Sequence, residues 1–301
     1  MQKTQLLDIF YSINNYIKKA GYKSAFNTFG IVLFKTFQHP ITMLYVIRAI
    51  AQFKYSKKTI LGNFKKSIFN AYSQNLILGD RVRALIFHND FVMSKLSKQF
   101  FECPNYECKL WALNNSDYLE IFLSNTNEHF THEGLLSLTL RLNGRPMFFF
   151  SFLICSGALF NISGPVLFLT RIQGIPNQYD SIKLINKLMG NLNLSNMLLS
   201  AAEGFSLSLG IRAIVSTGAS NQLSFNQDYS KNHFYSTYDE FLYKNGALLN
   251  RDGYFLLSVP LPIKELSMVQ THRSRHKKLS MIRYEISEAV REAVQSSILK
   301  S

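Results

Sequence analysis

Cysteine is scarce in this chain, which carries only Cys103, Cys108 and Cys155 among its 301 residues. Three thiols cannot form a complete disulfide framework, and no full set of cysteine and histidine ligands stands near them. A structural zinc site of the usual four-ligand kind is therefore not expected. The pattern indicates unreacted thiols in a reducing compartment.

Long uninterrupted apolar runs are also missing. Polar residues break the N-terminal stretch where a signal peptide needs an apolar core, which argues against export by that route. The most apolar segment, residues 147–170, is divided by Asn161, Gly164 and Pro165. Neither half reaches the roughly 20 residues that a helix needs to cross a bilayer. We therefore expect two strands of a sheet in this segment.

Acidic residues are few, and the common catalytic motifs are absent. The chain has 33 Lys and Arg against 19 Asp and Glu, which gives a formal charge of +14. This excess favours an anionic partner, such as an anionic membrane surface, a phosphate-bearing cofactor or nucleic acid. Nucleic acid is the least favoured, because no recognised nucleic-acid-binding module is visible. No nucleophile elbow, Walker loop or HExxH metal motif occurs.

Phenylalanine, in contrast, is abundant: the chain has 25 Phe within a hydrophobic fraction of 47%, which is enough for a core. The phenylalanine-rich stretch at 135–174 organises the rest of the chain. Asn143-Gly144 between two strand-like runs predicts a hairpin, and a second break follows at 161–165. The simplest interpretation is three consecutive antiparallel strands. The middle strand is apolar on both faces and therefore central in the sheet.

The spacing of apolar residues changes from helical to alternating near residue 100. We predict an α+β fold, in which a helical, basic N-terminal region (1–98) precedes a mostly antiparallel sheet domain flanked by helices (99–264). A basic C-terminal helix (265–301) packs on the sheet domain. The other predicted elements are strands at 109–113, 118–124, 211–216 and 254–258 and helices at 81–96, 180–190, 195–209 and 235–243.

The order of a strand meander, a glycine-bearing turn, a helix and a further strand resembles the core of the GNAT acyltransferases. In that family, backbone N–H groups at a splayed strand end and the following helix N-terminus bind the pyrophosphate of acyl-coenzyme A. The segment Arg171-Ile-Gln-Gly174 has the arginine and first glycine of the family's turn motif, and Pro176 stands at its last small position. The resemblance implies that Arg171, Gln173 and Gly174 bind acyl-coenzyme A or another phosphate-bearing acyl donor. An ordinary strand-to-helix turn is the alternative.

Acyl transfer to an amine needs a base that takes the proton of the amine and an acid that protonates the leaving thiolate. Glu120 or His132 would act as the base, and Tyr235 as the acid. Glu133 and His233 are further polar candidates on the predicted strands and loops. No residue is assigned to a metal.

Two basic segments offer a different function. The helix predicted at 55–72 has lysines interleaved with apolar residues, and a run of histidine, arginine and lysine at 272–278 opens the tail helix. Solvated charges on packed helices explain both segments without any partner. The functional interpretation is contact with anionic lipid or with phosphates.

Several spaced blocks, over roughly residues 81–284, resemble the VirK/YbjX proteins of Gram-negative bacteria. The chain departs from that family at Leu242, where tryptophan is usual, and at Asn221, which lacks a following histidine. The resemblance implies a role in virulence and envelope integrity, including resistance to cationic antimicrobial peptides, without a settled biochemical activity. The blocks are RVRALIFH (81–88), GLLSL (134–138), RIQG (171–174), LGIRAIVS (209–216), YDEF (238–241) and a basic run into Arg283-Tyr284.

The leading hypothesis is therefore a cytoplasmic or inner-membrane-associated factor that alters the envelope, with acyl or aminoacyl transfer as the candidate activity. The alternative is a non-catalytic interaction protein that docks on an anionic membrane or a protein partner through its basic helices.

Overall fold

The computed structural model describes residues 72–97, 107–114, 118–125, 133–225, 234–262 and 273–300. The N-terminal helices predicted before residue 72, with their lysine-rich segment at 55–72, lie outside these residues. So does the change from helix to strand predicted near residue 100.

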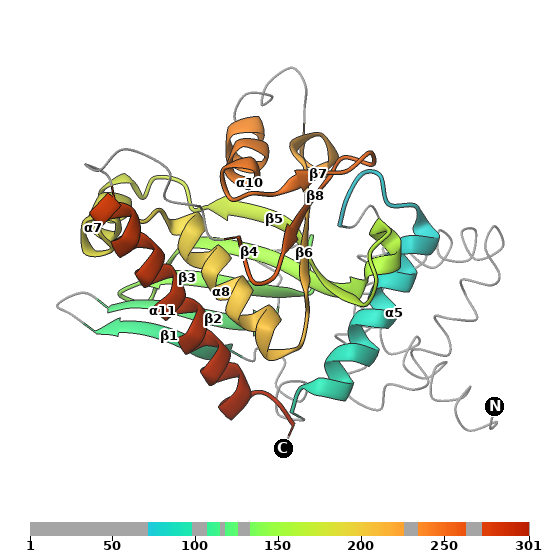
Figure 1. Ribbon diagram of the computed structural model, residues 1–301, viewed down its shortest axis with the longest axis horizontal. Helices are drawn as coiled ribbons and strands as arrows, with labels where there is room; N and C mark the ends of the chain where they lie inside the picture. The colour runs from blue at the N-terminus through green and yellow to red at the C-terminus, as the bar shows by residue number, and fades with distance from the viewer. Residues whose placement is uncertain are drawn as a thin grey trace, which may run out of the picture.

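An eight-stranded sheet forms the centre of the described structure, with the strand order β1-β2-β3-β4-β5-β6-β8-β7 (Figure 1). All neighbouring strands are antiparallel except β5 and β6, which are parallel. The predicted α+β class with a mostly antiparallel sheet is confirmed. The strands are β1 (Glu107–Asn114), β2 (Tyr118–Asn125), β3 (Leu136–Leu142), β4 (Arg145–Ser156), β5 (Pro165–Gly174), β6 (Ala213–Thr217), β7 (Leu248–Leu249) and β8 (Tyr254–Ser258).

The phenylalanine-rich stretch folds as three antiparallel strands, β3 to β5, as its turns predict. Asn143 and Gly144 form the hairpin turn with φ of 50° and 76°, a conformation that asparagine and glycine adopt most readily. Between β4 and β5 a short 3₁₀ turn, η1 (Gly157–Phe160), makes the second break. The apolar segment at 147–170 is thus a pair of strands. No helix in the described ranges combines the length and apolarity that crossing a bilayer requires.

The two faces of the sheet carry different helices. Helix α8 (Leu194–Ser208) packs on β3, β4 and β6, and α11 (Arg273–Ser297) packs on α8 and β1 (Figure 1). Side chains that alternate along β4, such as Phe152, point to this side, where the Phe152 ring meets that of Phe205 at 5.5 Å. Helix α5 (Leu78–Lys95) packs on β4 through the opposite residues, including Leu153 and Cys155. We call these the α8 face and the α5 face.

Two helices, α7 (Tyr179–Leu188) and α8, cross over from β5 to β6, as a parallel pair requires. The pair is short: Leu167–Leu169 of β5 face Ile214–Ser216 of β6, and no pairing follows. At this point β5 bulges, because Ser151 of β4 faces Arg171 whereas Phe152 faces Leu169. Thr170 is the extra residue. Beyond it, β5 continues to Gly174 without β6 beside it, so its end is free on that side.

The chain after β6 closes over this region. A 3₁₀ turn, η2 (Ala219–Asn221), precedes a π-helical turn, η3 (Tyr235–Glu240), which continues into the short helix α10 (Phe241–Lys244). The β7–β8 hairpin then returns to the edge of the sheet. Figure 1 places α10 above the end of β5.

Candidate functional site

A partly buried ion pair lies at the free end of β5. The Arg171 Nη1 atom is 3.4 Å from Oε1 of Glu133, whose side chain is 7% exposed. Glu133 reaches this position because the next residue, Gly134, lies against β4: a Cβ on it would be 2.7 Å from the backbone nitrogen of Phe152. Any residue other than glycine would push this segment away from β4. The close approach therefore positions the carboxylate beside Arg171.

Tyr238 meets β5 from the other side of the strand. The Ile172 N–H donates to the Tyr238 hydroxyl at 3.1 Å, which replaces the carbonyl that β6 no longer offers. The tyrosine is buried and projects from η3, a π-helical turn of the kind that often occurs at functional sites. A ligand that uses the Ile172 N–H must therefore displace this hydroxyl.

The surroundings of the site shift the pKa values of two of its residues, Glu133 and Tyr238. Burial raises the pKa of Glu133, and the nearby Arg171 guanidinium opposes this rise. Burial is also the main cause of the raised pKa of Tyr238, on which the charges of Glu133 and Arg171 act as well. The tyrosine thus keeps its proton, while the carboxyl is a weaker acid than an exposed glutamate. These are properties of a proton donor and a proton acceptor in one site.

Two polar atoms at the site have no partner within the described structure. Ser151 Oγ, opposite Arg171 on β4, and Gln173 Oε1 are both buried without a hydrogen bond. A buried polar group left without a partner costs about 1–3 kcal/mol. The neighbouring serines on the same row do have partners, because Ser124 Oγ and Ser137 Oγ form a hydrogen bond with each other at 2.9 Å. The unpaired atoms beside Arg171 are therefore suited to hold a polar ligand.

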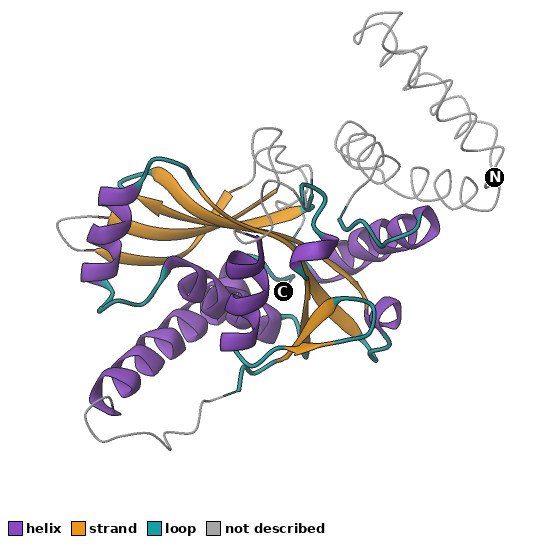
Figure 2. Ribbon diagram, turned by 90° about the horizontal axis from the view of Figure 1, so that it is seen from above, coloured by secondary structure: helices purple, strands orange, loops and turns teal. Residues whose placement is uncertain are grey.

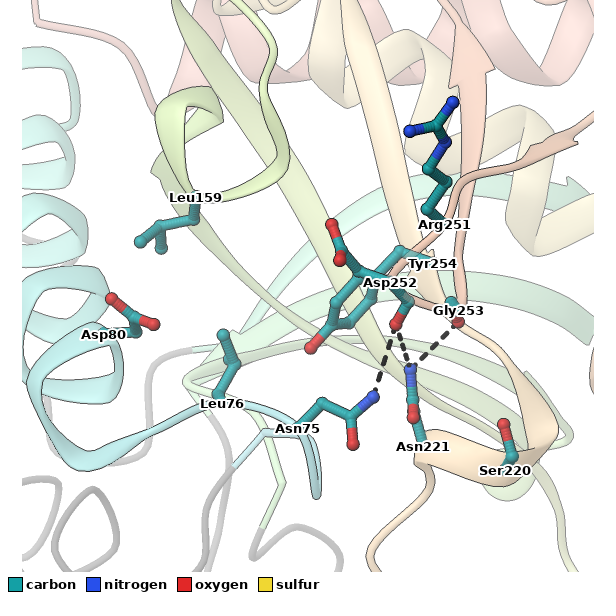
Figure 3. A pocket seen from close by; sticks show the side chains of 10 residues that line it. All are labelled: Asn75, Leu76, Asp80, Leu159, Ser220, Asn221, Arg251, Asp252, Gly253 and Tyr254. Atoms are coloured by element: carbon teal, nitrogen blue, oxygen red, sulfur yellow. Dashed lines mark hydrogen bonds between the residues drawn. The ribbon is translucent and has the colours of Figure 1, made fainter.

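A separate polar pocket of about 530 Å³ lies between the start of α5, η1, η2 and the β7–β8 turn (Figure 3). Asn221 Nδ2 holds the turn in place by donating to the carbonyl oxygens of Asp252 and Gly253, at 3.0 Å each. Asn75 Nδ2 donates to the same Asp252 oxygen at 3.3 Å. The carboxylates of Asp80 and Asp252 stand on two sides of the pocket (Figure 3). Amide side chains thus hold the walls of the pocket. The charged side chains that line it are Asp80, Asp252 and Arg251.

A family model described as "Protein of unknown function (DUF535)" matches residues 47–296. The chain belongs to this family. No curated protein matches the chain. The matched range contains both the strand-end site and the pocket, so both are parts of the DUF535 domain. The description of the DUF535 family names no activity.

In this DUF535 domain, the predicted donor-binding residues lie together at the end of β5. Arg171 is in the ion pair, and Gln173 carries one of the unpaired atoms. Gly174 faces Phe148, and a Cβ on it would lie 3.3 Å from that ring. Its small size therefore also serves the packing of this aromatic side chain.

Of the predicted acid and base residues, Glu120 and Tyr235 have partners other than Arg171. Glu120 lies on β2 and pairs with Lys109 at 3.3 Å. Strands β3 and β4 separate it from β5, a distance of about 14 Å at ordinary strand spacing. Tyr235 is 37% exposed at the start of η3, with its ring against Phe225 at 6.2 Å. His132 lies outside the described residues, as does His233.

Glu133 and Tyr238 are the titratable residues that contact the end of β5, through Arg171 and through the Ile172 N–H. Glu133 was among the polar candidates, and Tyr238 is the first residue of the YDEF block, but nothing in either segment alone connects it to Arg171. The described residues contain no group of three or more side chains suited to a metal ion.

Proposed function

We propose that this protein is a GNAT-like transferase, which moves an acyl or aminoacyl group from a phosphate-bearing donor to an amine at the free end of β5. The observation that carries the proposal is the early end of the β5–β6 pairing, after Leu169, at the place where an ion pair and a buried tyrosine converge. A parallel pair that separates at its carboxyl end creates the backbone donors that a phosphate or amide needs. The resemblance to VirK/YbjX proteins suggests the bacterial envelope as the place of action.

Each group of the site has a role in this reaction. The Glu133 carboxylate takes a proton from the amine as the amine nitrogen attacks the acyl carbon. The bond from that carbon to the donor's sulfur or oxygen breaks, and the Tyr238 hydroxyl gives its proton to the departing atom. Arg171 orients Glu133 through their ion pair and attracts the negative charge of the donor. Ser151 and Gln173 supply the unpaired polar atoms that bind the donor's amide groups.

The experiment is a donor screen with a matched pair of arginine variants. Arg171 and Arg141 are both partly buried, both ion-paired and both placed over a phenylalanine ring, with side chains 24% and 22% exposed. Only Arg171 lies on the part of β5 that has no β6 beside it. We expect acyl-coenzyme A or an aminoacyl donor to raise the melting temperature of the wild type and of Arg141→Ala, but not that of Arg171→Ala.

A second variant separates binding from chemistry. Tyr238→Phe frees the Ile172 N–H and removes the acid, so we expect tighter donor binding together with a fall in turnover of about 100-fold or more. If no donor shifts the melting temperature, or if Arg141→Ala loses the shift equally, the site is not a transferase centre.

A further inference from the structure

The beginning of α11 is an exposed, basic and partly apolar surface. Its N-terminal turns project away from the sheet (Figure 2). Among the residues exposed there are two large apolar side chains, Met281 at 57% and Tyr284 at 65%. The exposed cationic side chains are Arg275, Lys277 and Lys278, with His276 between them. We call these six residues the α11 surface.

Helical spacing separates this surface from the packed side of α11. Ile286 is buried in the core, and Leu279 and Ile282 are partly buried against it. Lys277, Met281 and Tyr284 follow one another at intervals of four and three residues, which places them on a common face directed to solvent. The apolar side chains of this face are thus adjacent to a cation, and they do not pack in the core.

The charges at this helix end oppose what helix stability favours. The N-terminus of a helix carries a partial positive charge, so acidic residues stabilise its first turn and basic residues destabilise it. Helix α11 has no acidic residue in its first turn. Within the described residues, none of Arg275, Lys277 and Lys278 takes part in an ion pair, whereas Arg291 near the other end pairs with Glu288. The basic turns are therefore better explained by an external partner than by folding.

We propose that the α11 surface docks this protein on an anionic lipid bilayer. The cations bind lipid phosphates, and Met281 and Tyr284 enter the boundary between headgroups and acyl chains, where methionine and tyrosine are well accommodated. The charge of the whole chain, +14, adds long-range attraction to such a membrane. Nucleic acid would satisfy the cations but not the two apolar side chains on the same face. The proposal does not depend on the transferase activity.

The test measures binding of the full chain to vesicles of phosphatidylglycerol and phosphatidylethanolamine, with phosphatidylcholine vesicles as the neutral reference. We expect Arg275→Gln/Lys277→Gln/Lys278→Gln to weaken binding to the anionic vesicles about 100-fold, since each basic residue near such a surface contributes about tenfold or less. Met281→Ser/Tyr284→Ser should weaken it while leaving the salt dependence unchanged.

The control variant removes the same charge from exposed arginine and lysine side chains on other elements: Arg83→Gln/Arg212→Gln/Lys244→Gln. It should bind the vesicles nearly as well as the wild type, and so should Arg171→Ala. Equal loss in the triple variant and its control would overturn the proposal, as would unchanged binding of the triple variant. Binding to DNA or RNA that requires the same three cations, without binding to vesicles, would replace the lipid by nucleic acid.

Discussion

The two faces of the sheet differ in the kinds of side chain that they carry. On the α8 face, buried apolar side chains of β2 to β5 meet a helix layer that approaches them closely. On the α5 face, a row of serines leads to the pair of Glu133 and Arg171, and α5 contributes a histidine to the backbone of β4. The larger apolar cluster therefore lies on the first face, and the second combines a smaller apolar cluster with the polar groups that a reaction needs.

The largest effect that we expect tests whether the α5 face also contributes to stability through His88. Its Nδ1 accepts a hydrogen bond from the Ile154 N–H at 3.0 Å, so the imidazole is neutral, and burial lowers its pKa to about 3. The unfolded chain, with a histidine pKa near its usual value of about 6.5, binds the proton more readily between these two values. Stability should fall as pH drops through this window, by about 4 kcal/mol in all.

The measurement is urea denaturation as a function of pH. His88→Gln offers an acceptor without a titrating group, so its stability should change less between pH 6.5 and 3 than that of the wild type. Parallel curves for the two proteins would show that His88 does not carry the pH dependence.

The next effect concerns the α8 face, where α8 and α11 touch at Gly204. A Cβ on Gly204 would collide with the carbonyl oxygen of Ser287, a backbone atom that cannot move alone. We expect Gly204→Ala to destabilise the protein by about 3 kcal/mol in urea denaturation. Gly210→Ala is the matched control. Gly210 has open space around it, and its φ of 71° should cost only about 1–2 kcal/mol. A cost for Gly204→Ala no greater than that of its control would mean that the helices can separate freely.

A smaller effect is expected at the boundary between the two faces. Tyr238→Phe removes the acceptor of the Ile172 N–H and should cost about 1–2 kcal/mol. Tyr243→Phe, at an exposed tyrosine on α10, should leave stability unchanged. Thermal unfolding of both variants provides the comparison, and equal melting temperatures would show that water satisfies the freed N–H.

The smallest expected change in stability belongs to Glu133→Gln. Because burial raises the pKa of Glu133 above its unfolded value, the contribution of this group is complete at low pH and is lost as pH rises through the folded pKa. Glutamine removes the ion pair with Arg171 but also the buried charge, so the net change near neutral pH should stay within about 1 kcal/mol. Transfer activity should nevertheless be lost. A variant that is strongly destabilised, or that remains active, would contradict the separation of roles between the faces.

The fold was largely predictable because local patterns specify it. The Asn143-Gly144 turn, the apolar strands on either side of it and the change from helical to alternating spacing are all short-range features. They sufficed for the class of fold and for the adjacent strands β3 to β5. The parallel β5–β6 pair was not among the predicted pairings, although a helical crossover between two strands favours such a pair.

The motif marks Arg171, Gln173 and Gly174, and Glu133 was one of several polar candidates, but the contacts of the site were not predictable. These contacts join distant parts of the chain: Glu133 lies 38 residues from Arg171, and Tyr238 lies 66 residues from Ile172. No periodicity or propensity connects such pairs. The choice of Glu120 as base followed from its place on a strand, but the register that keeps it at Lys109 becomes visible only in the assembled sheet.

The single extra residue in β5, Thr170, has a further consequence. Side chains of a strand alternate between faces, and the bulge takes up Thr170 so that Leu169 faces Phe152 while Arg171 faces Ser151. If β5 instead ran straight, with Thr170 opposite Ser151, the guanidinium of Arg171 would point toward α8 and Ile172 would lie on the α5 face. Deleting Thr170 would keep Arg171 opposite Ser151 and would remove only the irregularity of the strand. The face on which the guanidinium lies thus depends on where the strand accommodates its extra residue.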